Sequence, residues 1–243
     1  MNVLSLKNVS FASQNTQIIQ DVSLDIEEGQ AIALVGPSGS GKSTLLKLGA
    51  GLVIPTDGEI RYRDRNVFAM SRIQNLEFRK ESAFVFQDSA LWANQTLYQT
   101  LELPLRIHFP EMQVKQRHER IDEVIKTVGY KRSLSIRPAS LSAGEQKLIA
   151  FGRAMLCKPK LLFLDEFTES LDNYTAQRLT ALVKQQKMNN TTVIFIENNM
   201  KIIRNLADYV VMLVEGRIHA KTPVDKIDSD GEFSELLEKG IIE

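Results

Sequence analysis

Short runs of apolar residues alternate along the chain with stretches in which apolar and polar positions repeat at helical spacing. Continuous apolar runs, typical of strands buried on both faces of a parallel sheet, occur at residues 31–35, 161–164 and 192–196. Between the last two runs, residues 173–188 carry apolar side chains at i, i+3 and i+4 and predict a helix. Strands that alternate with helices in this way predict βαβ units and a mostly parallel sheet with helices on both faces.

The two ends of the chain show different patterns. Residues 4–9 predict a strand, and so do residues 21–26, which alternate polar and apolar positions. Residues 42–52 predict a helix. Near the C-terminus, two short segments at residues 209–214 and 217–220 flank Glu215-Gly216, which predicts a β-hairpin. The final predicted element is a short capping helix over residues 232–237.

The middle of the chain has another composition, rich in Gln, Leu, Glu and Arg from residue 89 to residue 137. Apolar positions at helical spacing predict a helix over residues 114–128, and we expect breaks in the helical structure at Pro104 and Pro110. We therefore predict a helical subdomain inserted at about residues 89–150 of a single domain that spans residues 1–243.

Composition excludes several classes of protein. The 243 residues include 30 Lys and Arg against 30 Asp and Glu, so no excess of positive charge is available to hold nucleic acid. The one cysteine, Cys157, excludes a disulfide framework and a cysteine-based zinc site. No apolar run approaches the ~18 residues that a membrane span requires, and the first residues do not resemble a signal peptide. We expect a soluble cytoplasmic chain that binds no nucleic acid.

The strongest motif is a complete G-x-x-x-x-G-K-S over residues 36–43, between a predicted strand and a predicted helix. Glycines let the backbone curl so that successive N–H groups point at phosphate oxygens, and the positive end of the helix dipole adds to this attraction. Lys42 is expected to reach the β- and γ-phosphates, and the Ser43 hydroxyl to coordinate Mg²⁺. The predicted phosphate-binding residues are Gly36, Pro37, Ser38, Gly39, Ser40, Gly41, Lys42, Ser43 and Thr44.

A second motif places two adjacent carboxylates, Asp165 and Glu166, directly after the apolar run at residues 161–164. Ligands of open α/β sheets bind at this carboxyl end of the strands. We expect Asp165 to hold Mg²⁺ and Glu166 to polarise the attacking water as general base. The competing interpretation is an exposed acidic pair with no function. The phosphate-binding loop elsewhere in the same chain argues against it.

A third motif, Leu-Ser-Ala-Gly-Glu-Gln at residues 141–146, precedes a predicted helix. At this point the chain resembles the ATP-binding cassette (ABC) ATPases, whose signature reads L-S-G-G-Q. Phe86-Gln87-Asp88 resembles the Q-loop of that family, and Ser170-Leu171-Asp172 resembles its D-loop. The resemblance covers essentially the whole chain and implies a P-loop NTPase core, an N-terminal antiparallel β subdomain and an inserted helical subdomain.

The resemblance also implies a function. In this family two cassettes, identical or different, pair head to tail, and each ATP is held between the phosphate loop of one and the signature of the other. Ser142 and the backbone N–H of Gly144 would meet the γ-phosphate of the partner's ATP, and Gln87 would meet Mg²⁺ and the attacking water. The implied protein is an ATP-hydrolysing subunit that powers an integral membrane transporter from the cytoplasmic face of the inner or plasma membrane.

Family members receive a short helix of a membrane subunit in a groove of the helical subdomain. Trp92, Leu91 and Leu97 could line such a groove or belong to the subdomain core, and the sequence favours neither. The stretches at residues 84–91 and 103–106 resemble the ATPases of lipid transporters of the mammalian-cell-entry type, which implies a lipid-type substrate.

Several positions depart from the family pattern. Ala143 and Glu145 stand in the signature where Gly and Gln are usual, which predicts weaker binding of the partner's ATP. Asn198 occupies the position of a histidine that contacts the γ-phosphate. Asparagine can donate a hydrogen bond but carries no positive charge, so we predict slow or partner-dependent hydrolysis in which Asn198 replaces that contact.

The aromatic residue that usually stacks on adenine is replaced by Ser13, two residues after Phe11, which is expected to be a strand core residue. Phe167 replaces the usual proline after the acidic pair. An alternative function is a nucleotide-gated regulatory or mechanical module that acts on a membrane complex without transport. A soluble ABC protein of DNA repair or translation is disfavoured, because the chain has neither a coiled-coil insert nor a second cassette.

Overall fold

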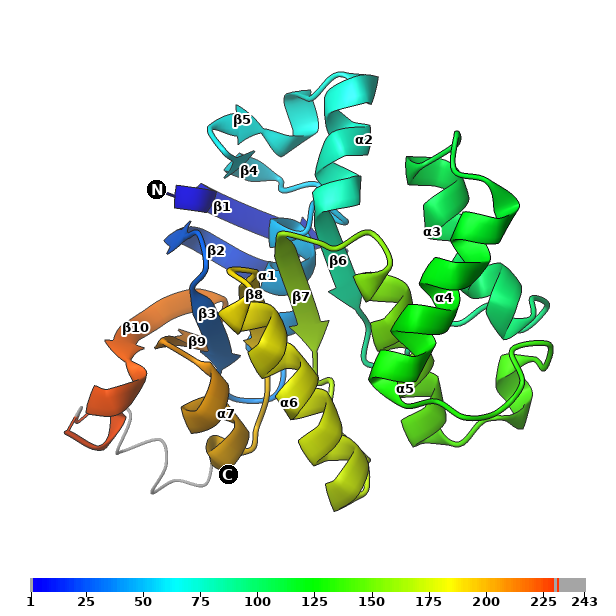
Figure 1. The fold of residues 1–243 in the computed structure, drawn as a ribbon. Coiled ribbons are helices and arrows are strands. Elements are labelled where there is room, and N and C mark those ends of the chain that lie inside the picture. Colours follow the sequence, from blue (N-terminus) through cyan, green and yellow to red (C-terminus); the bar gives the residue numbers. More distant parts are fainter. Residues whose placement is uncertain (1, 230, 232–243) are drawn as a thin grey trace.

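The computed structural model describes residues 2–229 and residue 231. A six-stranded sheet lies at its centre (Figure 1). The strand order is β10-β9-β3-β8-β7-β6, with β10 antiparallel to its neighbour and the other five strands parallel. Every residue of β3, β7 and β8 is buried, so the three continuous apolar runs form central strands as predicted. The strands are β3 (Ala31–Val35), β6 (Ser82–Val85), β7 (Leu161–Asp165), β8 (Thr192–Ile196), β9 (Tyr209–Val214) and β10 (Arg217–Pro223).

A second, antiparallel sheet is formed by the N-terminal part of the chain. Its order is β2-β1-β4-β5, and its strands are β1 (Asn2–Ser13), β2 (Thr16–Glu27), β4 (Asp57–Tyr62) and β5 (Arg65–Asn66). The predicted antiparallel β part is therefore confirmed. The first two strands are longer than predicted. Their pairing continues, with several shifts in register, as far as a tight turn at Gln14 and Asn15, both at positive φ.

Helix α1 (Lys42–Gly49) follows the phosphate loop and ends earlier than the predicted residue 52. The chain leaves the helix at Gly51, which has a φ of 64° and lies against Val67 and Phe78, so that an added Cβ would be 2.7 Å from a methyl group of Val67. A short 3-10 helix, η1 (Val67–Ala69), and helix α2 (Arg72–Glu81) complete the connection to β6.

Between β6 and β7 the described chain forms helices and no strand. These elements are α3 (Leu97–His108), α4 (Val114–Val128), the short η2 (Pro138–Ser140) and α5 (Ala143–Met155). Figure 1 shows α3, α4 and α5 together on one side of the central sheet, beside β6. The helical character of this segment agrees with the sequence pattern, whereas its status as a subdomain with limits at 89 and 150 stays a prediction.

The predicted break at Pro104 is wrong, because Pro104 lies inside α3. Proline removes one backbone N–H from the helix, but Leu97, Leu101 and Leu105 occupy one face of α3 and are fully buried. This packing holds the helix together across the proline. The chain does break at Pro110, which lies between α3 and α4 as expected.

Two hydrophobic cores flank the central sheet. One packs α3, α4, α5, α6 (Asn173–Met188) and α7 (Met200–Leu206) against one face, and the other packs the antiparallel sheet and α1 against the opposite face. Glu215 and Gly216 form the β9–β10 turn, both at positive φ, which confirms the predicted hairpin. The last element is η3 (Val224–Ser229), and the predicted helix at 232–237 lies outside the described residues. None of the helices described is both long and apolar enough to cross a bilayer.

Candidate active site

The phosphate loop joins β3 to α1, and three of its glycines have positive φ. Gly36 has no room for a side chain, because an added Cβ would lie 2.0 Å from the carbonyl oxygen of Leu213 on β9. The Lys42 Nζ donates hydrogen bonds of 2.7 Å to the carbonyl of Gly36 and 2.9 Å to that of Pro37. Burial lowers the pKa of Lys42, and the charges of Glu166 and Asp165 oppose this shift. The ammonium group thus lies across the loop that is predicted to hold phosphates.

The Ser43 hydroxyl donates a 3.0 Å hydrogen bond to Oδ1 of Asp165. Asp165 is the last residue of β7 and is 3% exposed, and burial raises its pKa above the usual range despite the bond from Ser43. A hydroxyl and a carboxylate side by side are oxygen ligands of the kind that Mg²⁺ prefers, so the donor set fits this ion.

Gln87 connects two carboxylates. Its Nε2 donates hydrogen bonds of 2.6 Å to Oε2 of Glu166 and of 2.6 Å to Oε2 of Glu169. Burial raises the pKa of Glu166, and the negative charges of Glu169 and Asp165 raise it further. Glu169 was not among the predicted site residues. A turn brings it back to the site, since its backbone N–H bonds to the carbonyl of Glu166, so a carboxylate three residues after Glu166 was the available signal.

Apart from Asp165, which is not part of the lining, these residues surround one cavity of about 810 Å³. Its lining is Ile18, Gly36, Pro37, Ser38, Gly39, Gly41, Lys42, Ser43, Thr44, Gln87, Glu166, Glu169 and Asn198. The phosphate loop, Gln87, Glu166 and Asn198 are therefore brought together. Ser40 does not line the cavity: its hydroxyl is buried within the loop and has no hydrogen-bond partner among the described residues.

The apolar wall of the cavity comes from Ile18 on β2, which sequence reasoning missed. Phe11 is partly buried against the core beneath the antiparallel sheet and does not line the cavity, in keeping with its predicted place in a strand core. Ser13 is the last residue of β1. The register of β1 and β2 decides which side chain faces the site, and the sequence motif alone does not reveal this register.

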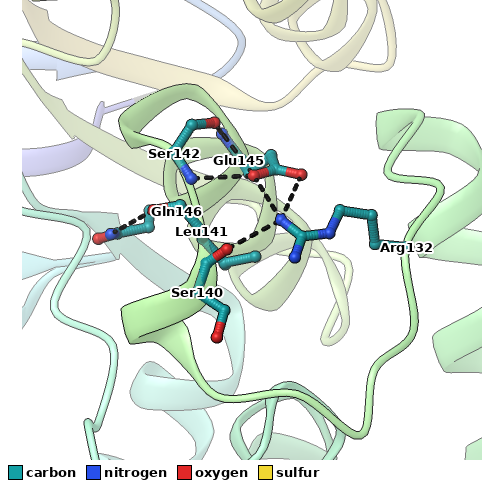
Figure 2. Close-up of polar contacts among 6 residues, drawn as sticks. All are labelled: Arg132, Ser140, Leu141, Ser142, Glu145 and Gln146. Atoms are coloured by element: carbon teal, nitrogen blue, oxygen red, sulfur yellow. Dashed lines mark hydrogen bonds and ion pairs between the residues drawn. The ribbon is translucent and has the colours of Figure 1, made fainter.

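The signature segment lies outside this cavity. Ser142 is the N-cap of α5 and is exposed, and Gly144 lies against Thr175 at the start of α6. Figure 2 shows the polar contacts at this helix end, in which Glu145 closes a capping box with Ser142 and pairs with Arg132. The two predicted groups of phosphate contacts are therefore on different surfaces of one chain.

Comparison with known proteins agrees with this arrangement. Residues 19–169 match the family model described as ABC transporter. The chain belongs to this family. It is 29% identical over 238 residues to the methionine import ATP-binding protein MetN of Clostridium tetani, covering 97% of this chain and 71% of the relative. It is also 33% identical over 222 residues to the nickel import ATP-binding protein NikE of Brucella suis, covering 90% of this chain and 83% of the relative.

Solved structures are similar over nearly the whole ABC cassette. A dimeric ATP-binding cassette in a post-hydrolysis state, bound to ADP and Pi, has a TM-score of 0.84 and 27% identity and covers 91% of this chain and 98% of its own. The protein is thus an ATP-binding and ATP-hydrolysing subunit of an ABC transporter. Its fold is the P-loop NTPase fold of ABC cassettes, with the antiparallel N-terminal sheet that the resemblance implied.

A buried lysine links three parts of the ABC cassette. Lys147 lies on α5 and is 5% exposed, and its Nζ donates to the backbone carbonyls of Glu166 at 3.1 Å and of Phe86 at 3.4 Å. Burial lowers its pKa, while four nearby carboxylates oppose the shift. The signature helix is thereby tied to the residue before Gln87 and to the acidic strand end. This role was not predicted, because a lysine on a helix next to the signature motif is expected to be exposed to solvent.

Glu197, which precedes Asn198, is also buried and was not singled out from the sequence. Its Oε1 accepts hydrogen bonds from the backbone N–H of Thr168 at 3.0 Å and from the hydroxyl of Thr168 at 2.6 Å. Burial raises the pKa of Glu197, although these bonds partly oppose the shift. The contact connects the segment after β7, which carries Glu166 and Glu169, to the segment after β8, which carries Asn198.

Proposed function

We propose that this ABC cassette holds Mg²⁺-ATP in the cavity of its phosphate loop, pairs with a second cassette, and uses hydrolysis to power transport through integral membrane subunits. One observation carries the proposal. The cavity contains the phosphate loop, Gln87, Glu166 and Asn198, whereas Ser142 and Gly144 lie outside it at an exposed helix end. Within one chain these two groups of residues lie apart, and a head-to-tail pair of cassettes would bring them together at two sites.

Within the cavity, each side chain has a task that its position supports. Lys42 would exchange its two backbone carbonyl partners for phosphate oxygens, because the triphosphate is the stronger acceptor. Gly36, Gly39 and Gly41 let the loop's N–H groups face the same phosphates. Ser43, Asp165 and the side-chain oxygen of Gln87 would hold Mg²⁺, which neutralises negative charge on the β- and γ-phosphates.

Glu166 is the proposed general base. A water oxygen attacks the γ-phosphorus, the water proton passes to the Glu166 carboxylate, and the bond from the γ-phosphorus to the β–γ bridging oxygen breaks, giving ADP and inorganic phosphate. The raised pKa of Glu166 makes its carboxylate a stronger base than a solvated one. Gln87 would leave Glu166 and Glu169 to meet Mg²⁺ and the attacking water.

The second cassette is most simply another copy of this chain, and a different cassette remains the alternative. Dimeric structures of a cassette with 27% identity to this chain support such pairing. Ser142 and Gly144 would then contact the γ-phosphate of the partner's ATP. Asn198 would supply one neutral hydrogen bond to the γ-phosphate where a histidine is usual, and we expect slow hydrolysis for that reason.

Membrane subunits are the other proposed partners. Among the three residues that could face them, Leu97 is fully buried in the core and Leu91 is partly buried against it, whereas the side chain of Trp92 is exposed and lies over Arg153. Trp92 is therefore the proposed contact. Binding to membrane subunits through this contact would place the protein on the cytoplasmic face of the membrane. The lipid-type substrate and the absence of a nucleic-acid partner stay predictions.

The test uses the purified chain with Mg²⁺-ATP. The parent should bind ATP and release phosphate, and Lys42→Ala should lose both by at least about 100-fold, since the contact is a charge-assisted one to a transferring phosphoryl group. Equal ATP binding by parent and Lys42→Ala would overturn the proposal. Retention of membrane subunits in detergent, followed by ATP-driven substrate movement in vesicles, separates a transporter from a regulatory or mechanical module.

A further inference from the structure

One oxygen atom at the exposed end of α5 accepts three hydrogen bonds (Figure 2). Oε2 of Glu145 receives the backbone N–H of Ser142 at 2.9 Å, the hydroxyl of Ser142 at 3.1 Å and Nη1 of Arg132 at 3.1 Å. The Ser142 hydroxyl oxygen in turn accepts the backbone N–H of Glu145 at 3.2 Å. The serine of the signature and a guanidinium group are therefore joined through a single carboxylate oxygen.

Arg132 comes from the segment between α4 and η2, which runs past the start of α5. Its Nη1 also donates a 2.9 Å bond to the carbonyl of Ser140, so the guanidinium group is held in place from two sides. The side chains of Arg132 and Glu145 are 48% and 25% exposed. Among the described residues, the other guanidinium N–H groups of Arg132 make no hydrogen bond, and they remain free toward solvent.

The charge of Glu145 affects whatever approaches this helix end. Hydrogen bonds from the backbone of Ser142 and from Arg132 hold the pKa of Glu145 below its usual range, so this carboxylate is ionised at neutral pH. A negative charge in the first turn stabilises the helix but repels an incoming phosphate, which is drawn to the same N–H groups. Like charges brought together at an interface oppose association.

We propose that Arg132 is a positioning residue of the paired ATP site, which cancels the charge of Glu145 so that the γ-phosphate of the partner's ATP can reach Ser142. The inference rests on the proposed function, because it needs a second cassette facing this helix end. Arg132 supplies the compensating positive charge, because it binds the same carboxylate oxygen of Glu145 as Ser142 does. Its guanidinium N–H groups that make no hydrogen bond among the described residues add to the positive potential around the incoming phosphate.

The experiment measures ATP-dependent association of the full chain in a Glu166→Gln background, in which hydrolysis is slowed. Sedimentation velocity over a range of protein concentrations with Mg²⁺-ATP gives the dimer dissociation constant. Arg132→Gln should weaken association by about tenfold, as expected for one uncompensated charge near a phosphate at a partly exposed site. Glu145→Gln should not weaken it, and the double variant should return to within about threefold of the parent, because charge balance is restored.

Lys131→Gln is the matched control. Lys131 is an exposed neighbour with the same charge, and within the described part of the chain it forms no hydrogen bond or ion pair with Glu145. It should change association by less than about threefold, and binding of ATP to the monomer should be the same in all variants. A loop-anchoring role for Arg132 would lower the melting temperature and would not be rescued by Glu145→Gln.

The outcomes separate the two proposals. Absence of ATP-dependent association in the parent background overturns the self-pairing part of the proposed function, and this inference with it. Association that is equal in the parent and Arg132→Gln, or weakened equally by Lys131→Gln, or not restored in the double variant, overturns the role of Arg132 alone.

Discussion

Ser43 and Asp165 are 122 positions apart in the sequence, and the hydroxyl of the first donates a 3.0 Å hydrogen bond to the carboxylate of the second. The contact joins the first turn of α1 to the end of β7, and it brings together two oxygen ligands that suit Mg²⁺. The pair is the most direct physical link between the phosphate loop and the acidic strand end.

Asp165→Asn should therefore raise the Mg²⁺ concentration needed for half-maximal ATP hydrolysis by about 10–100-fold, because one anionic contact to the ion is lost. Hydrolysis measured against total Mg²⁺ at saturating ATP gives this value. ATP binding in EDTA should be equal in the parent and the variant. An unchanged Mg²⁺ requirement would show that Asp165 does not take part in holding the ion.

Glu169 provides a prediction about pH. Its negative charge raises the pKa of Glu166, which must be ionised to accept a proton. Glu169→Gln removes that charge and should lower the pKa of Glu166, so the acid limb of the rate against pH should shift to lower pH. The profile of kcat/KM measures the shift in the free enzyme.

Glu169→Asp is the matched control for this shift, because it shortens the side chain and keeps the charge. Its acid limb should stay close to that of the parent. A limb that moves to higher pH in Glu169→Gln, or does not move, would contradict the influence of Glu169 on Glu166.

Asn198 lines the cavity. The family resemblance implies a histidine at this position, in contact with the γ-phosphate. Asn198→His should raise steady-state turnover by about 100–1,000-fold, since one preorganised donor is worth about that much. Asn198→Ala should leave turnover at or below the parental level. Turnover that is equal or lower in the histidine variant would contradict the predicted link between Asn198 and slow hydrolysis.

Thr168 provides two hydrogen bonds to the buried carboxylate of Glu197. Thr168→Val keeps the shape of the side chain but removes the hydroxyl, which leaves a buried acceptor with one bond fewer. The free energy of unfolding should fall by about 1–3 kcal/mol, measured by urea denaturation. Thr168→Ser retains the hydroxyl and should lose less. Equal loss in the two variants would assign the effect to packing of the methyl group.

Much of the fold could be predicted because strong local patterns coincide with buried elements. The runs at residues 31–35, 161–164 and 193–196 are apolar throughout, and such short runs are typical of strands covered on both faces. The predicted helix break at Pro104 was wrong, because it was based only on the unfavourable local effect of proline on a helix. The buried face of Leu97, Leu101 and Leu105 outweighs that effect, and this packing depends on segments distant in sequence.

The site divides in the same way. The phosphate loop and the acidic pair are contiguous motifs, since the chemistry needs a curled backbone and a strand end, and the sequence by itself determined them. Ile18, Glu169, Lys147 and Glu197 belong to no contiguous motif, and only the tertiary structure decided their places. The packing of α5 likewise decided that Ser142 lies outside the cavity. A sequence motif shows which side chains are present, whereas burial and strand register decide which of them come into contact.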